Sequence, residues 1–510
     1  MSRLLKGCQQ CRNRKVKCDR RTGGCRRCET RGEPCSGYSV EGAFIFKSET
    51  QKVEQKLQSQ SKVNGPLPKA TCSRMLTWRT PAGPCSNTTP FEFSISSNTP
   101  ESLRKELGTD NPEVWRFFDR FVMYPCNSGS SRGFLEHLPS LFMEPNITHR
   151  YALRYAVLAV AYASATDGTN GKERKQMAFH FYGLGLSALS KSLEDDITES
   201  SDYVLMTVVV LDIFESLYCD NPSTIDSHVQ GMRNILRLRG SHGEYDPKGW
   251  SLLRLSHHRM KRHELARGLP PMPDSTQWLD NLDEGDPFVD IEKRNSKINE
   301  VCEKARQCLR NVNNDGLDAL TIVSVIREMH TLDQLAVNWH EKPHWKFTTI
   351  SREDVECTPE LFALLPETLQ LHSDAWMAYE WNYHRTARIL MHCQLLKCLD
   401  RLDRLKNHTV NCEVNELRAY SLSTVRHLTD EILSTVPQSL GDITNKGKPI
   451  KSTTSPKGKA VGGYFLLWPT KVIKNLDIIT PHQAMYAELT FERIREHTGM
   501  KSALTDLRQD

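Results

Sequence analysis

The chain has 510 residues, of which 38% are hydrophobic and 25% are charged, and its formal net charge is +5. A chain of this length exceeds what one compact core usually holds, so we expect two or more domains with a large folded region. The best apolar run, residues 203–211, is cut by Asp212 and Glu215. That excludes a membrane-spanning helix, and we expect a soluble chain with no membrane partner.

The positive charge is concentrated at the beginning of the chain. Residues 1–38 carry 11 Lys or Arg and 3 Asp or Glu, whereas the other 472 residues carry 56 basic and 59 acidic side chains. A dense cationic segment beside a nearly balanced remainder is typical of a phosphate-binding surface.

The same segment contains six cysteines with the spacing C-x2-C-x6-C-x6-C-x2-C-x6-C, namely Cys8, Cys11, Cys18, Cys25, Cys28 and Cys35. The first three and the last three repeat one spacing, C-x2-C-x6-C. Structural zinc binds four thiolates in a tetrahedron, so two ions need only six sulfurs when two sulfurs are shared. The pattern predicts one binuclear cluster of two structural Zn²⁺ ions, with no coordination position open to a substrate.

Between the second and third cysteines the chain reads R-N-R-K-V-K without Gly or Pro, which predicts a short helix that begins at the metal. The spacing and this basic stretch resemble the fungal Zn(II)2Cys6 transcription factors. In that family the first and fourth cysteines bridge the zinc ions, here Cys8 and Cys25. Its first helix reads CGG-like triplets from positions that match Arg14 and Lys15. The candidate DNA contacts are Arg12, Arg14, Lys15, Lys17, Arg20, Arg21, Arg26 and Arg27.

One departure from the family is the loop between the third and fourth cysteines, which usually contains a proline. Here it reads D-R-R-T-G-G, and two glycines leave the unfolded chain freer, so we expect a folded but less rigid cluster. A disulfide framework is disfavoured because no apolar leader precedes the cysteines. An iron–sulfur site and a zinc deaminase site need other spacings or an H-x-E motif.

Residues 41–100 have the composition of a largely disordered linker. Prolines at positions 66, 68, 81, 84, 90 and 100 lie among Ser, Thr and Asn without sustained periodicity. A zipper is the weaker alternative for residues 41–60, because Val53 and Leu57 provide one apolar pair where a coiled coil needs several heptads.

Residues 101–510 show helical patterns nearly throughout and few alternating strand patterns. Helices are predicted near residues 151–165, 172–193, 201–219, 224–239, 297–313, 317–340, 372–401 and 411–436. The fold class is therefore mostly all-α: a small N-terminal Zn2Cys6 module over residues 1–40, a linker, and a large multi-helical domain.

Several stretches of this helical region are similar to the fungal-specific regulatory domain that commonly follows the zinc cluster. They are L-D-I-F-E-S at 211–216, H-V-Q-G-M-R-N-I-L-R-L-R-G at 228–240, W-M-A-Y-E-W-N-Y-H-R-T-A-R-I at 376–389 and Y-F-L-L-W-P at 464–469. Each stretch is a loose match alone, and the resemblance depends on their order and spacing; it covers roughly residues 110–500.

Catalytic motifs in the helical region lack their usual surroundings. Ser131 lies in a G-x-S-x-G sequence, but no parallel-sheet pattern surrounds it, so a loop between helices is favoured over a hydrolase nucleophile. Lys172 ends a poor match to a phosphate loop. His257, His258 and His263 lie among Arg and Lys without the H-E-x-x-H spacing, which favours a solvated basic helix over a zinc site.

Two polar segments have a regulatory alternative. Residues 280–292 mix six acids with apolar side chains, which favours an inter-helix loop, with an acidic activation segment as the alternative. Residues 441–463 combine glycines with five lysines and predict a disordered basic loop, with an accessory phosphate contact or nuclear-import patch as the alternative.

The sequence thus predicts a nuclear, sequence-specific regulator of RNA polymerase II transcription that binds double-stranded DNA through its zinc cluster. The helical domain would control output through transcriptional co-regulators, and a homodimer and a monomer both remain open. The rival is a metabolite sensor or a hydrolase in the helical domain, with the cluster only localising it. No catalytic constellation supports that rival, so we expect a protein that is not an enzyme.

Overall fold

The computed structural model describes part of the N-terminal segment and most of the chain from residue 111 onward. The described residues are 11, 14, 16–19, 21, 25–32, 35, 111–124, 133–144, 151–165, 171–194, 201–219, 225–239, 247–272, 278–279, 287–310, 315–337, 345–405, 412–450 and 459–498. The chain divides into two compact units, Met1–Asn98 and Thr99–Asp510. The predicted linker over residues 41–100 lies outside the described residues.

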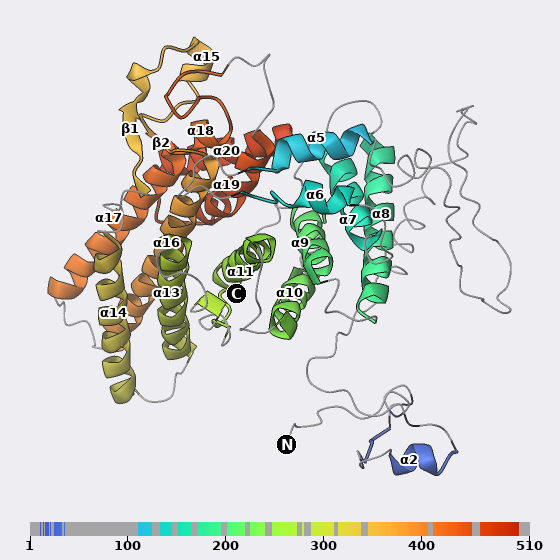
Figure 1. Ribbon diagram of the computed structural model, residues 1–510. Helices are drawn as coiled ribbons and strands as arrows, with labels where there is room; N and C mark the ends of the chain where they lie inside the picture. Colours follow the sequence, from blue (N-terminus) through green and yellow to red (C-terminus); the bar gives the residue numbers. More distant parts are fainter. Residues whose placement is uncertain are drawn as a thin grey trace, which may run out of the picture. The chain divides into compact units, whose positions relative to one another are not determined.

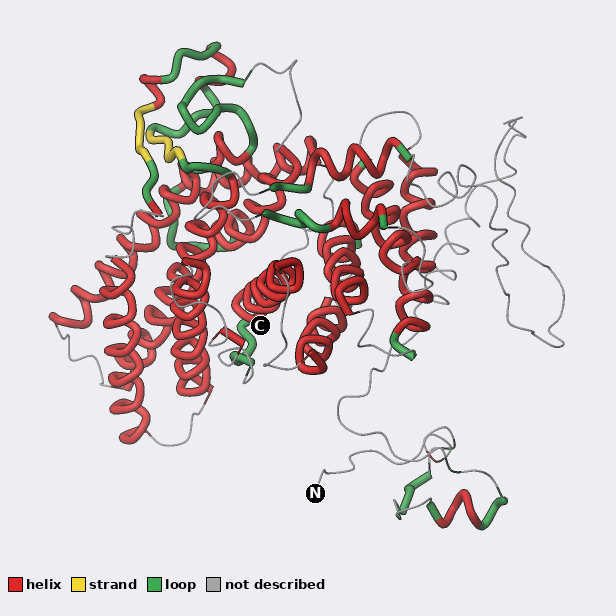
Figure 2. Tube along the Cα trace, in the orientation of Figure 1, coloured by secondary structure: helices red, strands yellow, loops and turns green. Residues whose placement is uncertain are grey.

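The described part of the second unit is built from helices, with one small hairpin (Figures 1 and 2). The predicted all-α class is thereby confirmed. None of the helices in the described ranges has the length and apolar character that a membrane crossing requires.

The first group of helices in this unit surrounds a buried central helix. The group consists of α5 (Pro112–Phe121), α6 (Leu138–Met143), α7 (Tyr151–Ser164), α8 (Gly171–Ser192), α9 (Ser201–Tyr218) and α10 (Ile225–Arg239). Helix α7 is rich in alanine and apolar on almost every face, which lets α5, α8 and α9 pack against it on different sides.

A second group of helices packs around α16 (Ala375–Leu405). Its other members are α13 (Pro287–Arg310), α14 (Asp315–Val337), α17 (Cys412–Ser434), α18 (Val436–Ser439), α19 (Lys459–Lys474) and α20 (Pro481–Thr498). Helix α16 contacts α13, α14, α17, α18 and α19, and α20 packs against α17 and α19. Because α16 is enclosed in this way, its Tyr, His, Asn and Arg side chains must find partners inside the protein.

Helix α11 (Pro247–Arg267) lies between the two groups (Figure 1). It contacts α9 and α10 of the first group and α13 of the second. Any polar residue on its inward faces is therefore held between helices that are far apart in the sequence.

The hairpin pairs β1 (Thr348–Ser351) with β2 (Thr368–Leu371) in antiparallel register, with Thr348 opposite Leu371. Along the chain, the segment that connects the two strands contains the short helices η5 (Arg352–Asp354) and α15 (Pro359–Phe362). The hairpin packs through a small apolar core of Val355, Leu365, Leu369, Leu371 and Ile443. Four-residue strands give too short an alternation to be recognised from the sequence.

All eight helices that the sequence predicts are present, with ends shifted by a few residues. The largest shift is in α13, which begins at Pro287 rather than near residue 297. The predicted loop over residues 280–292 is therefore wrong from residue 287 onward, where Val289 and Ile291 are buried in the core. Residues 280–286 lie outside the described residues.

The predicted disordered loop over residues 441–463 is wrong at both of its ends. Residues 441–450 form a turn in which Thr444 N donates to Lys448 O at 2.8 Å, and α19 has already begun at Lys459. The glycines that suggested disorder have packing reasons. A Cβ on Gly462 would lie 1.7 Å from the carbonyl oxygen of Ser439, and one on Gly447 would lie 2.8 Å from Ile350 Cδ1. Residues 451–458 lie outside the described residues.

Candidate metal centre and nucleic-acid interface

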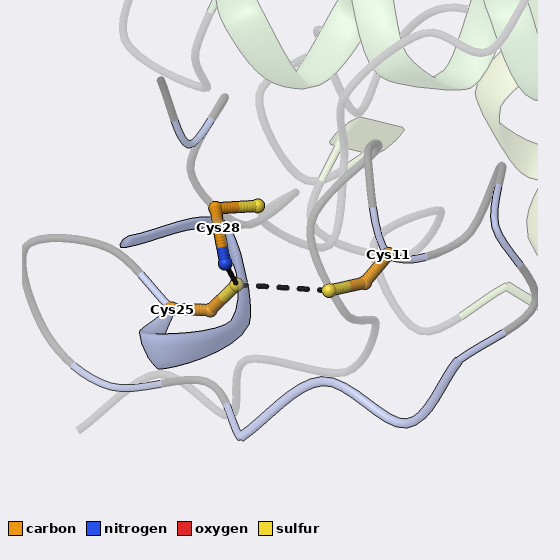
Figure 3. Close-up of side chains that lie close together, drawn as sticks. All are labelled: Cys11, Cys25 and Cys28. Carbon is orange, nitrogen blue, oxygen red and sulfur yellow. Dashed lines mark hydrogen bonds between the residues drawn. The ribbon is translucent and has the colours of Figure 1, made fainter. Parts of the chain in front are cut away.

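Three cysteine sulfurs of the N-terminal unit lie close together (Figure 3). Cys11, Cys25 and Cys28 are fully buried, and their ligand atoms all lie within 4.8 Å of one another. The Sγ atoms of Cys11 and Cys25 are 3.6 Å apart. Cys18 and Cys35 pack against these three, so five of the six predicted ligands form one cluster. Cys8 lies outside the described residues.

The sulfur positions fit zinc. Two thiolates on one tetrahedral zinc, each with a Zn–S bond of about 2.3 Å, are separated by about 3.8 Å. The 3.6 Å separation of Cys11 and Cys25 is close to this value. Thiolates are also the ligands that zinc accepts in closed structural sites, where it supplies folding energy and no open position for a substrate.

Backbone and side-chain N–H groups point at the sulfurs. Helix α2 (Arg26–Glu29) begins at Cys25, whose sulfur accepts a hydrogen bond from Cys28 N at 3.3 Å. Cys25 N in turn donates to Cys35 Sγ at 3.3 Å. The Arg14 guanidinium lies 3.5 Å from Cys28 Sγ. Such contacts hold the ligand sulfurs in place.

The predicted DNA-contacting residues in the described part of the module differ in how far their side chains are exposed to solvent. Lys17, Arg21, Arg26 and Arg27 are exposed, whereas Arg14 is half-buried against the cluster. Lys17 lies in the stretch predicted to be a short helix. Cys11, directly before that stretch, is helical and its O accepts a hydrogen bond from Val16 N at 3.0 Å, but Val16 and Lys17 themselves are not helical, so the predicted helix does not reach the end of the stretch. The candidates Arg12, Lys15 and Arg20 lie outside the described residues.

Sequence reasoning missed the part that Asp19 plays in this module. Its carboxylate accepts a hydrogen bond from the backbone N–H of Arg26, at 3.2 Å for Oδ1 and 3.1 Å for Oδ2. Asp is a common helix-capping residue, but a standard cap directly precedes its helix, and here that position belongs to Cys25, so no capping pattern in the sequence points to Asp19.

In the helical unit, the predicted solvated basic helix is wrong. Residues 254–267 are helical, as part of α11, but His257, His258, Arg259 and Lys261 are each at most 3% exposed. The local sequence resembles a charged surface because Lys261 is paired within α11, with Glu264, whereas other neutralising groups come from distant helices. One of them is Asp212 on α9, whose Oδ2 lies 2.7 Å from Arg259 Nε.

His258 joins α11 to two helices of the second group. Its Nδ1 lies 2.7 Å from Glu292 Oε1 on α13, and its Nε2 lies 2.6 Å from the Tyr379 hydroxyl on α16. Burial lowers the pKa of His258 to about 4 and raises the pKa of Glu292 to about 8. Both groups are then neutral at pH 7, so Glu292 donates its proton to Nδ1 and Nε2–H donates to Tyr379.

These buried groups are therefore fixed in neutral hydrogen bonds inside packed helices, which suits a structural junction better than proton transfer to a substrate. Ser131 of the G-x-S-x-G sequence lies outside the described residues, and Lys172, from the poor match to a phosphate loop, lies in the first turn of α8.

A cationic segment that carries a thiolate cluster, followed by an α-helical domain, defines a zinc-cluster protein with a separate regulatory region. The comparisons with known proteins agree. Residues 6–41 match the fungal Zn(2)-Cys(6) binuclear cluster domain, and residues 116–438 match the fungal specific transcription factor domain. The chain belongs to the fungal-specific transcription factor family. It is a DNA-binding transcription regulator whose cluster domain binds two zinc ions.

A curated relative supports the same class. The chain is 24% identical over 428 residues to "Transcription factor dbaG" of Emericella nidulans, an alignment that covers 79% of this chain and 91% of the relative. No solved structure matches the chain significantly.

Proposed function

We propose that the two zinc ions are held by Cys8, Cys11, Cys18, Cys25, Cys28 and Cys35, with Cys8 and Cys25 shared between them. The observation that carries this proposal is the burial of Cys11, Cys25 and Cys28 with their sulfurs at zinc-compatible separations. Cys25 is well placed for a shared ligand, since its sulfur lies at the start of α2 and 3.6 Å from Cys11 Sγ.

The cluster presents the first helix to the major groove of DNA, where Arg14 and Lys15 read a CGG-like triplet. An arginine or lysine can donate to both guanine O6 and N7, which is the commonest base-specific contact. Lys17, Arg21, Arg26 and Arg27 are exposed and support a phosphate-contacting role, which we extend to Arg12 and Arg20. Phosphate contacts position the module without distinguishing sequences.

The helical domain controls transcriptional output in the nucleus through co-regulators, on DNA bound by a monomer or a homodimer, and it is not an enzyme. Support for a non-catalytic role comes from α11, whose His258 and Arg259 side chains are buried against Asp212, Glu292 and Tyr379.

The test is selection of bound DNA from a random pool by the full-length zinc-loaded protein. Enrichment of CGG-like triplets supports the proposal, and one triplet or two at fixed spacing separates a monomer from a dimer. A matched selection with Arg14→Ala and Lys15→Ala combined should lose the enrichment while retaining salt-sensitive binding. A pool without sequence enrichment from the wild-type protein would contradict sequence-specific regulation.

A further inference from the structure

Asp19 links the two halves of the zinc module. It directly follows Cys18 in the first half, and its carboxylate accepts the backbone N–H of Arg26, the first residue of α2, in the second half. The first N–H groups of a helix have no partner within the helix, so an acceptor placed there stabilises the helix start.

The position of α2 matters to the metal because two sulfurs move with it. Cys25 is the N-cap of α2, and Cys28 lies within the helix. Residues 20–24 between Asp19 and Cys25 are R-R-T-G-G, with no proline to restrict them. A hydrogen bond across this segment restrains the separation of Cys18 from Cys25 in a way that the covalent chain alone does not.

We propose that Asp19 is a positioning residue for the zinc cluster. Through its hydrogen bond with the Arg26 amide, Asp19 holds α2 in place together with the zinc ligands Cys25 and Cys28. The proposal rests on the zinc-ligand assignment above. It assigns Asp19 no bond to metal, because six thiolates already fill all positions of two tetrahedral ions when two are shared.

The other chemistry open to Asp19 is direct metal binding, because its carboxylate and the sulfurs of Cys18 and Cys25 lie within 4.8 Å of one another. Asn separates the two roles. An Asn side chain keeps an oxygen that can accept the Arg26 N–H, but it lacks the negative charge that makes carboxylate a good zinc ligand.

The experiment measures zinc release from the full-length protein to a chromogenic chelator, together with hydrogen exchange of the peptide that contains residues 25–32. A helix-capping interaction corresponds to a factor of about 5 to 30, so Asp19→Ala should release zinc and exchange these amides faster by that factor. Asp19→Asn should stay within about threefold of wild type, since a neutral acceptor keeps most of a capping interaction.

Glu29→Ala is the matched control. It removes the same charge from the same module, at a side chain that is 68% exposed and lies 3.5 Å from Arg21, and it should release zinc at the wild-type rate. Equal rates for Asp19→Ala and wild type would overturn the role of Asp19. So would an Asp19→Asn protein that binds one zinc ion, because this would make Asp19 a ligand. Wild-type protein with fewer than two zinc ions contradicts the ligand assignment instead.

Discussion

Nε of Arg259 lies 2.7 Å from Oδ2 of Asp212, and both side chains are almost completely buried. The contact joins α11 to α9, and the Tyr464 hydroxyl on α19 accepts a further hydrogen bond from the same guanidinium. A single arginine thus connects α9, α11 and α19, and its partners Asp212 and Tyr464 are far apart in the sequence. The buried pair gives α11 one position relative to its neighbours.

Removing one partner of this pair should be far more damaging than removing an exposed pair. Asp212→Ala leaves the Arg259 charge without its carboxylate, which costs about 3 to 5 kcal/mol of folding free energy at a buried site. Glu328→Ala is the control, because the Lys304–Glu328 pair is 52% and 42% exposed and such pairs contribute about 1 kcal/mol or less. Denaturant unfolding followed by helical circular dichroism measures both changes. Equal losses in the two variants would show that the Asp212 contact is not a structural junction.

The His258–Glu292 contact predicts a pH dependence of folding stability. Burial raises the pKa of Glu292 from 4.5 to about 8, although Lys261 opposes the shift. Between these values the folded chain binds a proton that the unfolded chain has lost, so this group's contribution to stability falls as pH rises. The pKa of His258 is lowered from 6.5 to about 4, so its opposite contribution is confined to pH below 6.5.

The window from pH 6.5 to 8 therefore isolates Glu292. At about 1.4 kcal/mol per pH unit, wild type should lose about 2 kcal/mol relative to Glu292→Gln across this range. His257 lies 3.7 Å from the other carboxylate oxygen of Glu292, and Tyr383 and Lys261 also face the carboxyl, so all three stay unchanged in the comparison. Parallel stability curves for the two proteins would mean that Glu292 is ionised in the folded state.

The contrast between α7 and α11 shows what local sequence can predict. Helix α7 is alanine-rich and apolar on almost every face, so its burial follows from composition alone. The sequence of α11 predicts a charged surface helix. Its polar side chains can be buried because His258 and Arg259 bind Glu292, Asp212 and Tyr464 in other helices. Periodicity reports which residues share a face of one helix, but it carries no information about charge compensation by distant segments.

In the zinc module, too, one feature could be predicted from the local sequence and another could not. The cysteine spacing predicted the cluster, because metal chemistry fixes both ligand type and number within a short segment. The Asp19–Arg26 contact could not be predicted, since one carboxylate near a short helix has many alternative partners. The glycine at position 462 was misread because its close approach to Ser439 depends on how α18 and α19 pack.

Substitution of cluster cysteines should separate shared ligands from unshared ones. If Cys25 is bound to both ions, Cys25→Ser weakens the coordination of both, and the full-length protein should lose two zinc ions together. Cys18→Ser removes a ligand of one ion, so one zinc should remain initially. Native mass spectrometry of the two variants at limiting chelator gives the metal count directly. A Cys25→Ser protein that keeps one ion would contradict its bridging role.

Exposed arginines of α2 should contribute affinity without sequence preference. Arg26→Ala and Arg27→Ala should each weaken binding to a CGG-containing site and a scrambled site by the same factor. Each should also reduce the slope of log affinity against log salt by about 0.9, the value for one phosphate contact on duplex DNA. Lys304→Ala in the helical unit removes the same charge from an exposed side chain and should leave the slope unchanged. A change in base preference on losing Arg26 or Arg27 would instead assign them to base reading.

Arg14 should behave differently from Arg26 and Arg27, because it contacts Cys28 within the protein and is proposed to contact a guanine in the DNA. Its Nη2 lies 3.5 Å from Cys28 Sγ in the protein alone, and reading a guanine requires two N–H groups of the same guanidinium to face O6 and N7. Arg14→Ala should therefore cost about 1 to 3 kcal/mol on the CGG-containing site and relax preference at one base position, with a smaller loss on the scrambled site. Arg14→Lys keeps the charge but loses the forked donor pair, so it should retain salt sensitivity and recover only part of the discrimination between the two sites.

Fluorescence anisotropy at two salt concentrations measures the affinity of the Arg14 variants for both sites, and zinc release from the same variants reports on the cluster. Equal weakening of both sites, combined with faster zinc release, would place Arg14 in support of Cys28 and leave base reading to Lys15.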